Sequence, residues 1–208
     1  MLFRSLLYIC GDSFGVPDPA YGPCWVDYLQ QLIPTHHIIN LSRVCASNLM
    51  ISQQVDQAIP YGDQIIVLCT ASTRSQTRQN GQVIPYSIHS LDTTTPFSAR
   101  QLGALKSYTR EFFDLDLAIY ENQCIIESML QRLTDSHRPF LWDQGGFEHA
   151  SYGGTRKYFE KWAWRRSSRN LWDYAQSREH RPYYHITDDH VHREVAGYYA
   201  GWIHAQAR

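Results

Sequence analysis

The feature that most constrains the fold of this chain is an uninterrupted apolar run that ends at Cys69. From Ile65 to Cys69 every side chain is apolar, and most of them are β-branched. A strand with apolar side chains on both faces has to be covered on both faces, which is typical of the parallel sheets of α/β proteins. We therefore expect a buried strand over residues 64–69 in a parallel sheet.

Further strands and helices alternate along the chain. Short apolar segments predict strands over residues 3–10, 37–41 and 139–142. Helical spacing of apolar residues predicts helices over residues 25–33, 48–58, 99–113, 115–133 and 191–207. Pro34 ends the first helix, and Ser47 is placed to cap the second. Strands that alternate with helices indicate a single α/β domain over residues 1–208.

Two segments depart from this alternation. Residues 70–98 are polar and rich in turn formers, and Asn80-Gly81 within them predicts a hairpin turn. Residues 147–184 are dense in Trp, Tyr and Arg and have no strand pattern. We expect this second segment to be a lid or a helical, aromatic-rich insertion.

The composition excludes several classes of protein. Hydrophobic residues make up 43% of the 208 residues and charged residues 19%, which is typical of a globular domain. The formal net charge of -1 gives no overall attraction to nucleic acid. No apolar stretch is long enough to cross a membrane, and the first residues do not form a signal peptide. The odd number of cysteines, with no Cys-x-x-Cys pair, favours a reducing compartment, so we expect a cytoplasmic protein without a cofactor.

Two short motifs carry candidate chemistry. Gly11-Asp12-Ser13 directly follows the first predicted strand, and Asp189-His190-Val191-His192 lies at the start of the last predicted helix. A serine, a histidine and an aspartate are the groups that covalent acyl transfer uses as nucleophile, base and orienting acid. Taken alone, the first motif equally suits a turn or a helix cap.

The expected topology brings these motifs to one place. Ligands of open parallel sheets bind beyond the carboxyl ends of the strands. Ser13 follows the first strand, Cys45 the second, and the segment from Thr70 to Arg74 the strand that ends at Cys69. A loop before the last helix can bring Asp189 and His192 to the same edge.

These motifs resemble the blocks of the SGNH (GDSL-type) hydrolase superfamily. Gly11-Asp12-Ser13 resembles its first block, residues 40–47 its second, and residues 189–192 its last. The resemblance implies a three-layer α/β/α, flavodoxin-like domain. It also implies Ser13 as nucleophile, Asp189 and His192 as its partners, and the backbone N–H groups of Ser13 and Cys45 as oxyanion donors. The family normally has glycine where this chain has Cys45.

The third block departs from the family pattern. The family has Gly-x-Asn-Asp after the third strand, with the Asn amide donating to the oxyanion, whereas residues 70–74 here are Thr-Ala-Ser-Thr-Arg. Ser72 falls near the Asn position, and the Arg74 guanidinium is a second candidate donor. Loss of one oxyanion donor lowers turnover by about a hundredfold to a thousandfold. Asp12 is expected to organise its turn by accepting backbone N–H groups.

The expected function is that of a serine esterase, acting on a small-molecule ester or on an O-acyl group of a carbohydrate. One alternative is a binding module of the same fold for a glycan or polyanion, because basic and aromatic residues cluster between positions 157 and 172. Another is a zinc or manganese site in the histidine-rich segment 180–192, although no second cluster of ligands accompanies it. The sequence leaves the oligomeric state open.

Overall fold

The core of the computed structural model is a parallel sheet of four strands in the order β2-β1-β3-β6. The structure describes residues 5–17, 22–79, 81–88, 91, 97–143 and 189–206. The sheet strands are β1 (Ser5–Cys10), β2 (His36–Asn40), β3 (Gln64–Leu68) and β6 (Phe140–Asp143). Their register places Leu7 opposite Ile38, and Ile66 opposite both Ile9 and Leu141. The predicted parallel sheet is confirmed, and β3 lies inside it as its continuous apolar sequence requires.

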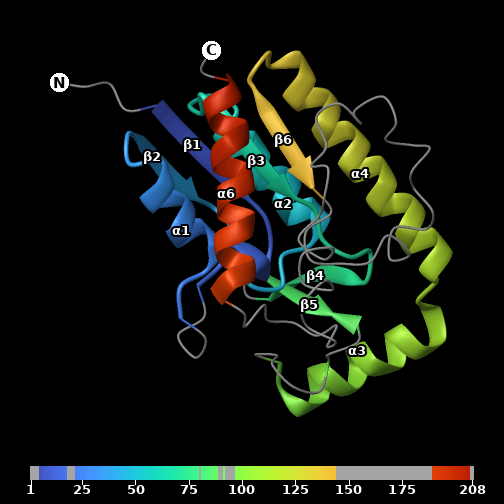
Figure 1. Cartoon of the computed structure of the whole chain (residues 1–208). Coiled ribbons are helices and arrows are strands. Elements are labelled where there is room, and N and C mark those ends of the chain that lie inside the picture. Colours follow the sequence, from blue (N-terminus) through green and yellow to red (C-terminus); the bar gives the residue numbers. More distant parts are fainter. Residues whose placement is uncertain are drawn as a thin grey trace.

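Helices cover both faces of this sheet, so the molecule has three layers (Figure 1). One face carries α1 (Trp25–Leu32) and α6 (Asp189–Gln206), and the other carries α2 (Asn48–Ala58) and α4 (Leu115–Asp135). Successive strand residues point to opposite faces. Ile66 and Leu68 accordingly pack with α1 and α6, while Ile65 and Val67 pack with α2 and α4. The expected three-layer α/β/α fold class is confirmed.

Local capping explains where α2 begins. The Oγ of Ser47 accepts a hydrogen bond of 3.3 Å from the backbone N–H of Met50, which satisfies one of the free donors of the first turn. Ile51 and Val55, one helical turn apart, are fully buried against the sheet. The helix bounds match the prediction, because cap and apolar spacing are both local features.

The segment after β3 turns back as a separate hairpin. Strands β4 (Arg74–Gln79) and β5 (Gln82–Ser87) pair antiparallel, with Gln79 opposite Gln82. Gly81 has a φ of 80°, which glycine adopts without strain. The predicted turn at Asn80-Gly81 is therefore in place, although Asn80 itself lies outside the described residues.

Helix α3 (Ala99–Phe112) follows the hairpin and has no buried residue among those described. Its amino end is capped by Ser98, whose backbone N–H and side chain both engage Gln101. The helix was predicted from its periodicity, but its exposure was not. The proposed insertion at residues 147–184 lies outside the described residues.

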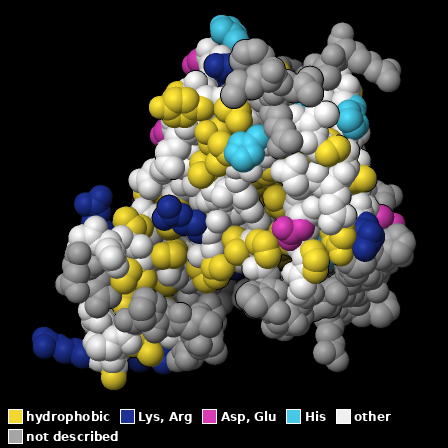
Figure 2. All heavy atoms as spheres, turned by 90° about the vertical axis from the view of Figure 1, so that its left-hand side faces the viewer, with side chains coloured by type: hydrophobic (Ala, Val, Ile, Leu, Met, Phe, Trp, Pro, Cys, Tyr) yellow, Lys and Arg dark blue, Asp and Glu magenta, His cyan; other side chains and the backbone are white. Residues whose placement is uncertain are grey.

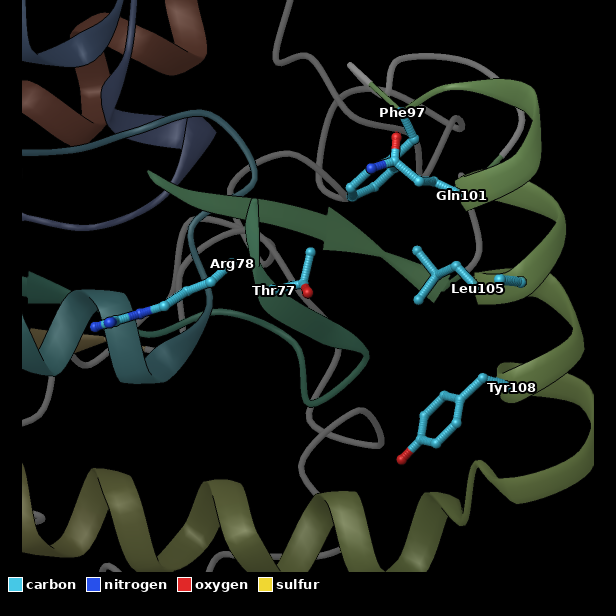
Figure 3. Close-up of a pocket in the computed structure, with 7 residues that line it drawn as sticks. Thr77, Arg78, Phe97, Gln101, Leu105 and Tyr108 are labelled. Carbon is cyan, nitrogen blue, oxygen red and sulfur yellow. The ribbon is translucent and has the colours of Figure 1, made fainter. Parts of the chain in front are cut away.

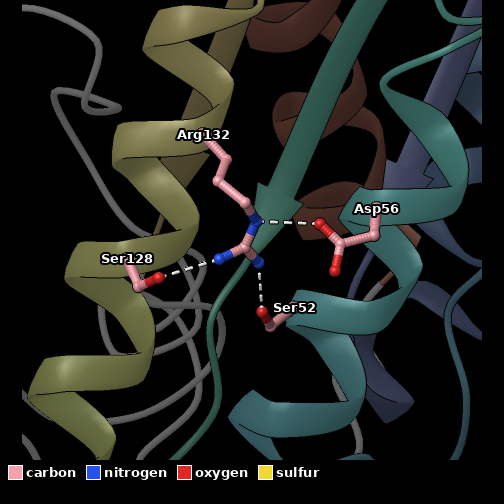
Figure 4. Close-up of polar contacts among 4 residues, drawn as sticks. All are labelled: Ser52, Asp56, Ser128 and Arg132. Atoms are coloured by element: carbon pink, nitrogen blue, oxygen red, sulfur yellow. Dashed lines mark hydrogen bonds and ion pairs between the residues drawn. The ribbon is translucent and has the colours of Figure 1, made fainter.

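Helices α2 and α4 are joined on their outer side by Arg132 (Figure 4). Its guanidinium donates to Asp56 at 2.8 Å, to Ser128 at 2.8 Å and to Ser52 at 2.6 Å. Ser52 and Asp56 are one turn apart on α2, so one side chain holds two positions of that helix. Within the described part of the chain, no helix has the length and apolarity needed to cross a bilayer.

Candidate active site

Ser13 lies in a short 3-10 turn, η1 (Ser13–Gly15), which two residues, Gly11 and Asp12, separate from the end of β1. The Oδ1 of Asp12 accepts a hydrogen bond of 3.1 Å from the backbone N–H of Phe14, and its carbonyl accepts one of 3.2 Å from Gly15. Asp12 thus organises the turn as expected from its place in the sequence. The turn presents Ser13 beyond the carboxyl end of β1, at the edge of the sheet where ligands of parallel sheets bind.

Ser13 keeps its donors available in this conformation. The residue is half-buried, and among the described residues neither its hydroxyl nor its backbone N–H donates a hydrogen bond. Its carbonyl accepts a hydrogen bond of 3.1 Å from Val16, which closes the turn. The two donors are thus left for another partner.

The loop after β2 is tied to this turn through Asn40. The amide Nδ2 of Asn40 donates to the carbonyl of Gly15 at 2.6 Å, and its Oδ1 accepts from the backbone N–H of Ser42 at 3.0 Å. One side chain therefore fixes the entry of the second loop against the exit of the Ser13 turn.

Cys45, in the same loop, has a φ of 61°. This left-handed conformation is adopted freely by glycine and is strained for a residue with a side chain. The conformation explains why glycine suits this position in the family that the sequence resembles. Within the described part of the chain, the backbone N–H of Cys45 donates no hydrogen bond.

The loop after β3 is held by Asn48, the first residue of α2. The Oδ1 of Asn48 accepts from the backbone N–H of Thr70 at 2.8 Å, and its Nδ2 donates to the Thr70 carbonyl at 2.7 Å and to Asn122 at 2.8 Å. Asn122 also donates to the carbonyl of Ser72 at 3.4 Å. Ser72 and Arg74 are both buried, so the two residues predicted to replace the family's Asn lie inside this loop.

Asp12 is the electrostatic centre of these loops. It is fully buried, and its Oδ2 accepts a hydrogen bond of 2.7 Å from the hydroxyl of Thr70. Burial raises the pKa of the Asp12 carboxyl above its ordinary value, and the positive charge of Arg74, with the hydrogen bonds from Thr70 and Phe14, offsets part of the rise. The Arg74 charge therefore acts on Asp12, a pairing that the sequence did not reveal. The signal that could have found it is the position of Arg74 in the loop after the neighbouring strand, because a buried carboxylate needs donors or positive charge from nearby loops.

Helix α6 brings the last motif to the same end of the sheet. Its amino end lies at the end of the molecule toward which the parallel strands point (Figure 1). Val195 and Tyr199 are buried in the cluster against which Phe14, the neighbour of Ser13, also packs. His192 is half-buried in the first turns of this helix. No hydrogen bond joins Ser13 to His192 among the described contacts, so the proposed pairing of these two residues stays a prediction.

Asp189 is the first residue of α6, two residues earlier than the predicted start of that helix. Its side chain lies outside the described part of the structure. The proposed pairing of Asp189 with His192 therefore stays a prediction.

Asp143 is a further buried carboxylate at this edge, at the end of β6. Its Oδ2 accepts a hydrogen bond of 3.3 Å from the hydroxyl of Tyr199, and its carbonyl accepts one of 2.8 Å from Cys69. The contact fixes α6 across the end of the sheet. The apolar segment 139–142 predicted a strand ending just before Asp143 but gave no partner for this carboxylate.

Comparisons with known proteins give the fold a context. No family model matches the chain, and no curated protein matches it. Among solved structures, LAE5, an α/β hydrolase enzyme from the metagenome of Lake Arreo in Spain, aligns over 95% of this chain and 94% of its own, with 12% identity and a TM-score of 0.56. A variant of Axe2, an acetyl-xylooligosaccharide esterase from Geobacillus, aligns over 96% and 94%, with 13% identity and a TM-score of 0.55.

The chain has the fold of these hydrolases. A third solved structure, AlinE4, described as an SGNH-hydrolase family esterase, aligns over 100% of this chain and 98% of its own, with 13% identity and a TM-score of 0.48. At these identities the likeness establishes the fold, and the chemistry of the site rests on the residues of this chain.

Beside this hydrolase fold core, the hairpin and α3 enclose an open cavity of about 310 Å³ (Figure 3). Gln101, Leu105 and Tyr108 point from α3 toward the hairpin, whereas the Arg78 side chain points away from them. The cavity is lined by Thr77, Arg78, Phe97, Gln101, Ala104, Leu105 and Tyr108. Strand β4 begins at Arg74, so the hairpin that lines this cavity rises from the loop that contacts Asp12.

The metal alternative is not tested by this structure. Among the described residues, no group of three or more His, Cys, Asp or Glu is placed to hold a metal ion. Most of the histidine-rich segment 180–192 that prompted the alternative lies outside the described residues.

Proposed function

We propose that the protein is a serine esterase that cleaves a carboxylic ester through Ser13. The observation that carries this proposal is the position of Ser13, which occupies a fixed turn at the ligand-binding edge of the sheet with its hydroxyl and backbone N–H free of described partners. We assign His192 as the general base and Asp189 as the residue that orients it. The esterase neighbours support a hydrolase of this type.

The proposed reaction has two steps. His192 takes the proton of the Ser13 hydroxyl while the oxygen attacks the ester carbonyl, and the alcohol leaves with that proton, which yields an acyl-serine. Water then loses a proton to His192 and attacks the acyl-serine. Ser13 regains its proton, and the carboxylic acid is released.

The oxyanion of each step is expected to be held by the backbone N–H groups of Ser13 and Cys45. Both belong to loops that Asn40 joins, through its hydrogen bonds to the Gly15 carbonyl and the Ser42 N–H, which supports a preformed arrangement of the two donors. Such preorganisation is what makes an oxyanion hole effective. Ser72 and Arg74 remain our candidates for a third donor, which would come from the loop after β3.

For the substrate, we propose an O-acyl group on a carbohydrate. Axe2 is described as an acetyl-xylooligosaccharide esterase, and in this chain the ring of Tyr108 on α3 lines a cavity with Thr77 and Arg78 of β4, the strand that begins at Arg74. Aromatic side chains with neighbouring polar groups are suited to sugar rings. Acetylated xylo-oligosaccharides and p-nitrophenyl acetate, compared as substrates, test this part of the proposal separately from the esterase activity.

The experiment that tests the esterase combines turnover and labelling. We expect the wild-type protein to hydrolyse short p-nitrophenyl esters and to be labelled by a fluorophosphonate at Ser13, and we expect Ser13→Ala to lose both. Ser128→Ala, far along α4, serves as the matched serine variant with unchanged activity. An unlabelled, inactive wild-type protein would contradict the proposal.

The alternative of a binding module predicts retained glycan or polyanion binding without ester turnover. On the face shown in Figure 2, Lys and Arg side chains are spread among acidic and neutral ones and form no basic patch among the described residues. The basic and aromatic segment on which this alternative rests, between positions 157 and 172, lies outside the described residues. Binding to a glycan array by an inactive wild-type protein would favour this alternative.

We also propose that the protein works in a reducing compartment such as the cytoplasm. None of the five cysteines forms a disulfide in the structure, and three of them, Cys10, Cys24 and Cys69, are buried. Burial raises the pKa of the Cys24 thiol to about 11, so this residue is kept as an unreactive thiol.

A further inference from the structure

Gln54 binds both polar groups of a single backbone position, Gly11. Its Oε1 accepts a hydrogen bond of 2.7 Å from the Gly11 N–H, and its Nε2 donates one of 3.2 Å to the Gly11 carbonyl. Gln54 lies on α2 and is buried, with 4% of its surface exposed. The Gln54 amide thus makes the two hydrogen bonds that a neighbouring strand would make to this residue, and it fixes the orientation of the Gly11 backbone.

Gly11 is the position from which the Ser13 turn departs. Its carbonyl also accepts a hydrogen bond of 3.2 Å from the backbone N–H of Arg43, in the loop that carries Cys45. A side chain at Gly11 would come within 3.1 Å of the Cβ of Leu68. The backbone is therefore closely packed on one side and held by the Gln54 amide on another.

Helix α2 is a rigid support for this contact. It holds a second loop in the same manner, because Asn48 bonds both polar backbone groups of Thr70, and the Thr70 hydroxyl in turn bonds Asp12. Two amide side chains of one helix thus hold the two residues before Ser13: Gln54 binds Gly11 directly, and Asn48 acts on Asp12 through Thr70. Sub-ångström placement of a nucleophile matters, since a displacement of about 1 Å can lower a rate by about a hundredfold.

We propose that Gln54 is a positioning residue for Ser13, and that its two hydrogen bonds to Gly11 hold the nucleophile turn in its reactive geometry. This inference rests on the proposed esterase function. The simpler explanation is that Gln54 only satisfies two buried backbone groups and contributes to stability. The two explanations differ in what they predict for turnover at equal stability.

The test compares Gln54→Met with Ser52→Ala in the full-length protein. Methionine keeps the length of the side chain and removes both hydrogen bonds to Gly11. Ser52 is a buried residue of the same helix, two positions from Gln54, and its hydroxyl accepts a hydrogen bond of 2.6 Å from Arg132 (Figure 4). Ser52→Ala therefore controls for the loss of a buried hydrogen bond on α2.

The readouts are kcat and KM for p-nitrophenyl acetate, the rate of fluorophosphonate labelling of Ser13, and Tm. For Gln54→Met we expect kcat and the labelling rate to fall together by about tenfold or more, with KM within about threefold of wild type. For Ser52→Ala we expect a comparable loss of Tm with kcat within about twofold of wild type.

A folded Gln54→Met variant that keeps its kcat and labelling rate would overturn the inference. If that variant does not fold, Gln54→Glu decides, because its carboxylate still accepts from the Gly11 N–H but no longer donates to the carbonyl. We expect an intermediate kcat, and a wild-type kcat in Gln54→Glu would overturn the inference equally. An inactive wild-type protein would instead refute the proposed function.

Discussion

Thr70 and Asp12 are joined by a buried hydrogen bond of 2.7 Å between the threonine hydroxyl and Oδ2 of the carboxylate. The two residues follow different strands of the sheet and are 58 positions apart in the chain. Because Asp12 also caps the turn that holds Ser13, this bond connects the loop after β3 to the candidate nucleophile.

Replacing Thr70 by valine tests this link. Valine keeps the shape of the side chain but leaves one oxygen of a buried carboxylate without its donor. We expect the free energy of unfolding to fall by about 1–3 kcal/mol, measured by guanidinium denaturation at pH 7. Thr70→Ser keeps the hydroxyl and is the control. Equal stability of the valine variant and wild type would show that the bond contributes nothing.

Asp12 also predicts how stability depends on pH. Because burial raises the pKa of its carboxyl in the folded state, the folded protein binds more protons than the unfolded chain between the ordinary pKa and the raised one. The stabilising contribution of this group is therefore fully present below the ordinary pKa and is lost as the pH rises through the raised value.

The variant Asp12→Asn removes this titration. We expect the free energy of unfolding of wild type, minus that of the variant, to decrease as the pH rises from about 4. Guanidinium denaturation in steps from pH 4 to pH 8 measures the difference. A difference that stays constant or increases over this range would contradict the raised pKa.

Cys45 is expected to be a site where glycine stabilises the protein. Its φ of 61° is strained for a side chain, and Cys45→Gly relieves that strain while keeping the backbone N–H. We expect a gain of about 1 kcal/mol in the free energy of unfolding. Cys45→Ala keeps the strain and should show no such gain, which separates the backbone effect from removal of the thiol. A destabilised glycine variant would count against the left-handed conformation.

Gly15 is packed closely against Ser42. A Cβ at Gly15 would clash with the Ser42 hydroxyl and lie 2.9 Å from its Cβ. We expect Gly15→Ala to lower the free energy of unfolding by about 1–3 kcal/mol through overpacking.

The second substitution Ser42→Gly should restore much of that loss, since it removes both atoms involved in the clash. A double-mutant cycle by guanidinium denaturation measures the coupling, which we expect to be at least about 0.5 kcal/mol. Additive effects of the two changes would mean that the two residues are not in contact.

Arg132 should be worth more to stability than its partner Asp56. The ion pair between them is largely exposed, with 37% and 54% of the two side chains accessible, so Asp56→Ala should lower the free energy of unfolding by less than about 1 kcal/mol. Arg132→Met also removes the hydrogen bonds to Ser52 and Ser128, and its loss should be larger. Thermal denaturation of both variants measures the difference, and equal losses would assign the whole effect to the ion pair.

Much of the fold could be predicted from neighbouring residues. The apolar β-branched residues of β3, the cap at Ser47 and the turn at Asn80-Gly81 are local signals, and each corresponds to an observed feature. The ends of the elements were predicted less accurately. Strand β3 ends at Leu68, one residue before the predicted end, and α6 begins at Asp189, two residues before the predicted start. Fraying and tertiary contacts decide such ends, and the hydrophobic period does not encode them.

The sequence alone determined the alternation of strands and helices, and with it the edge of the sheet on which Ser13 lies. Only the tertiary structure decided which polar groups meet there, namely Gln54 with Gly11 and Thr70 with Asp12. It also decided that α3 is exposed. The physical reason is that hydrophobic periodicity is written in consecutive residues. A polar partner tens of positions away is selected by strand order and register, which exist only once the chain has folded.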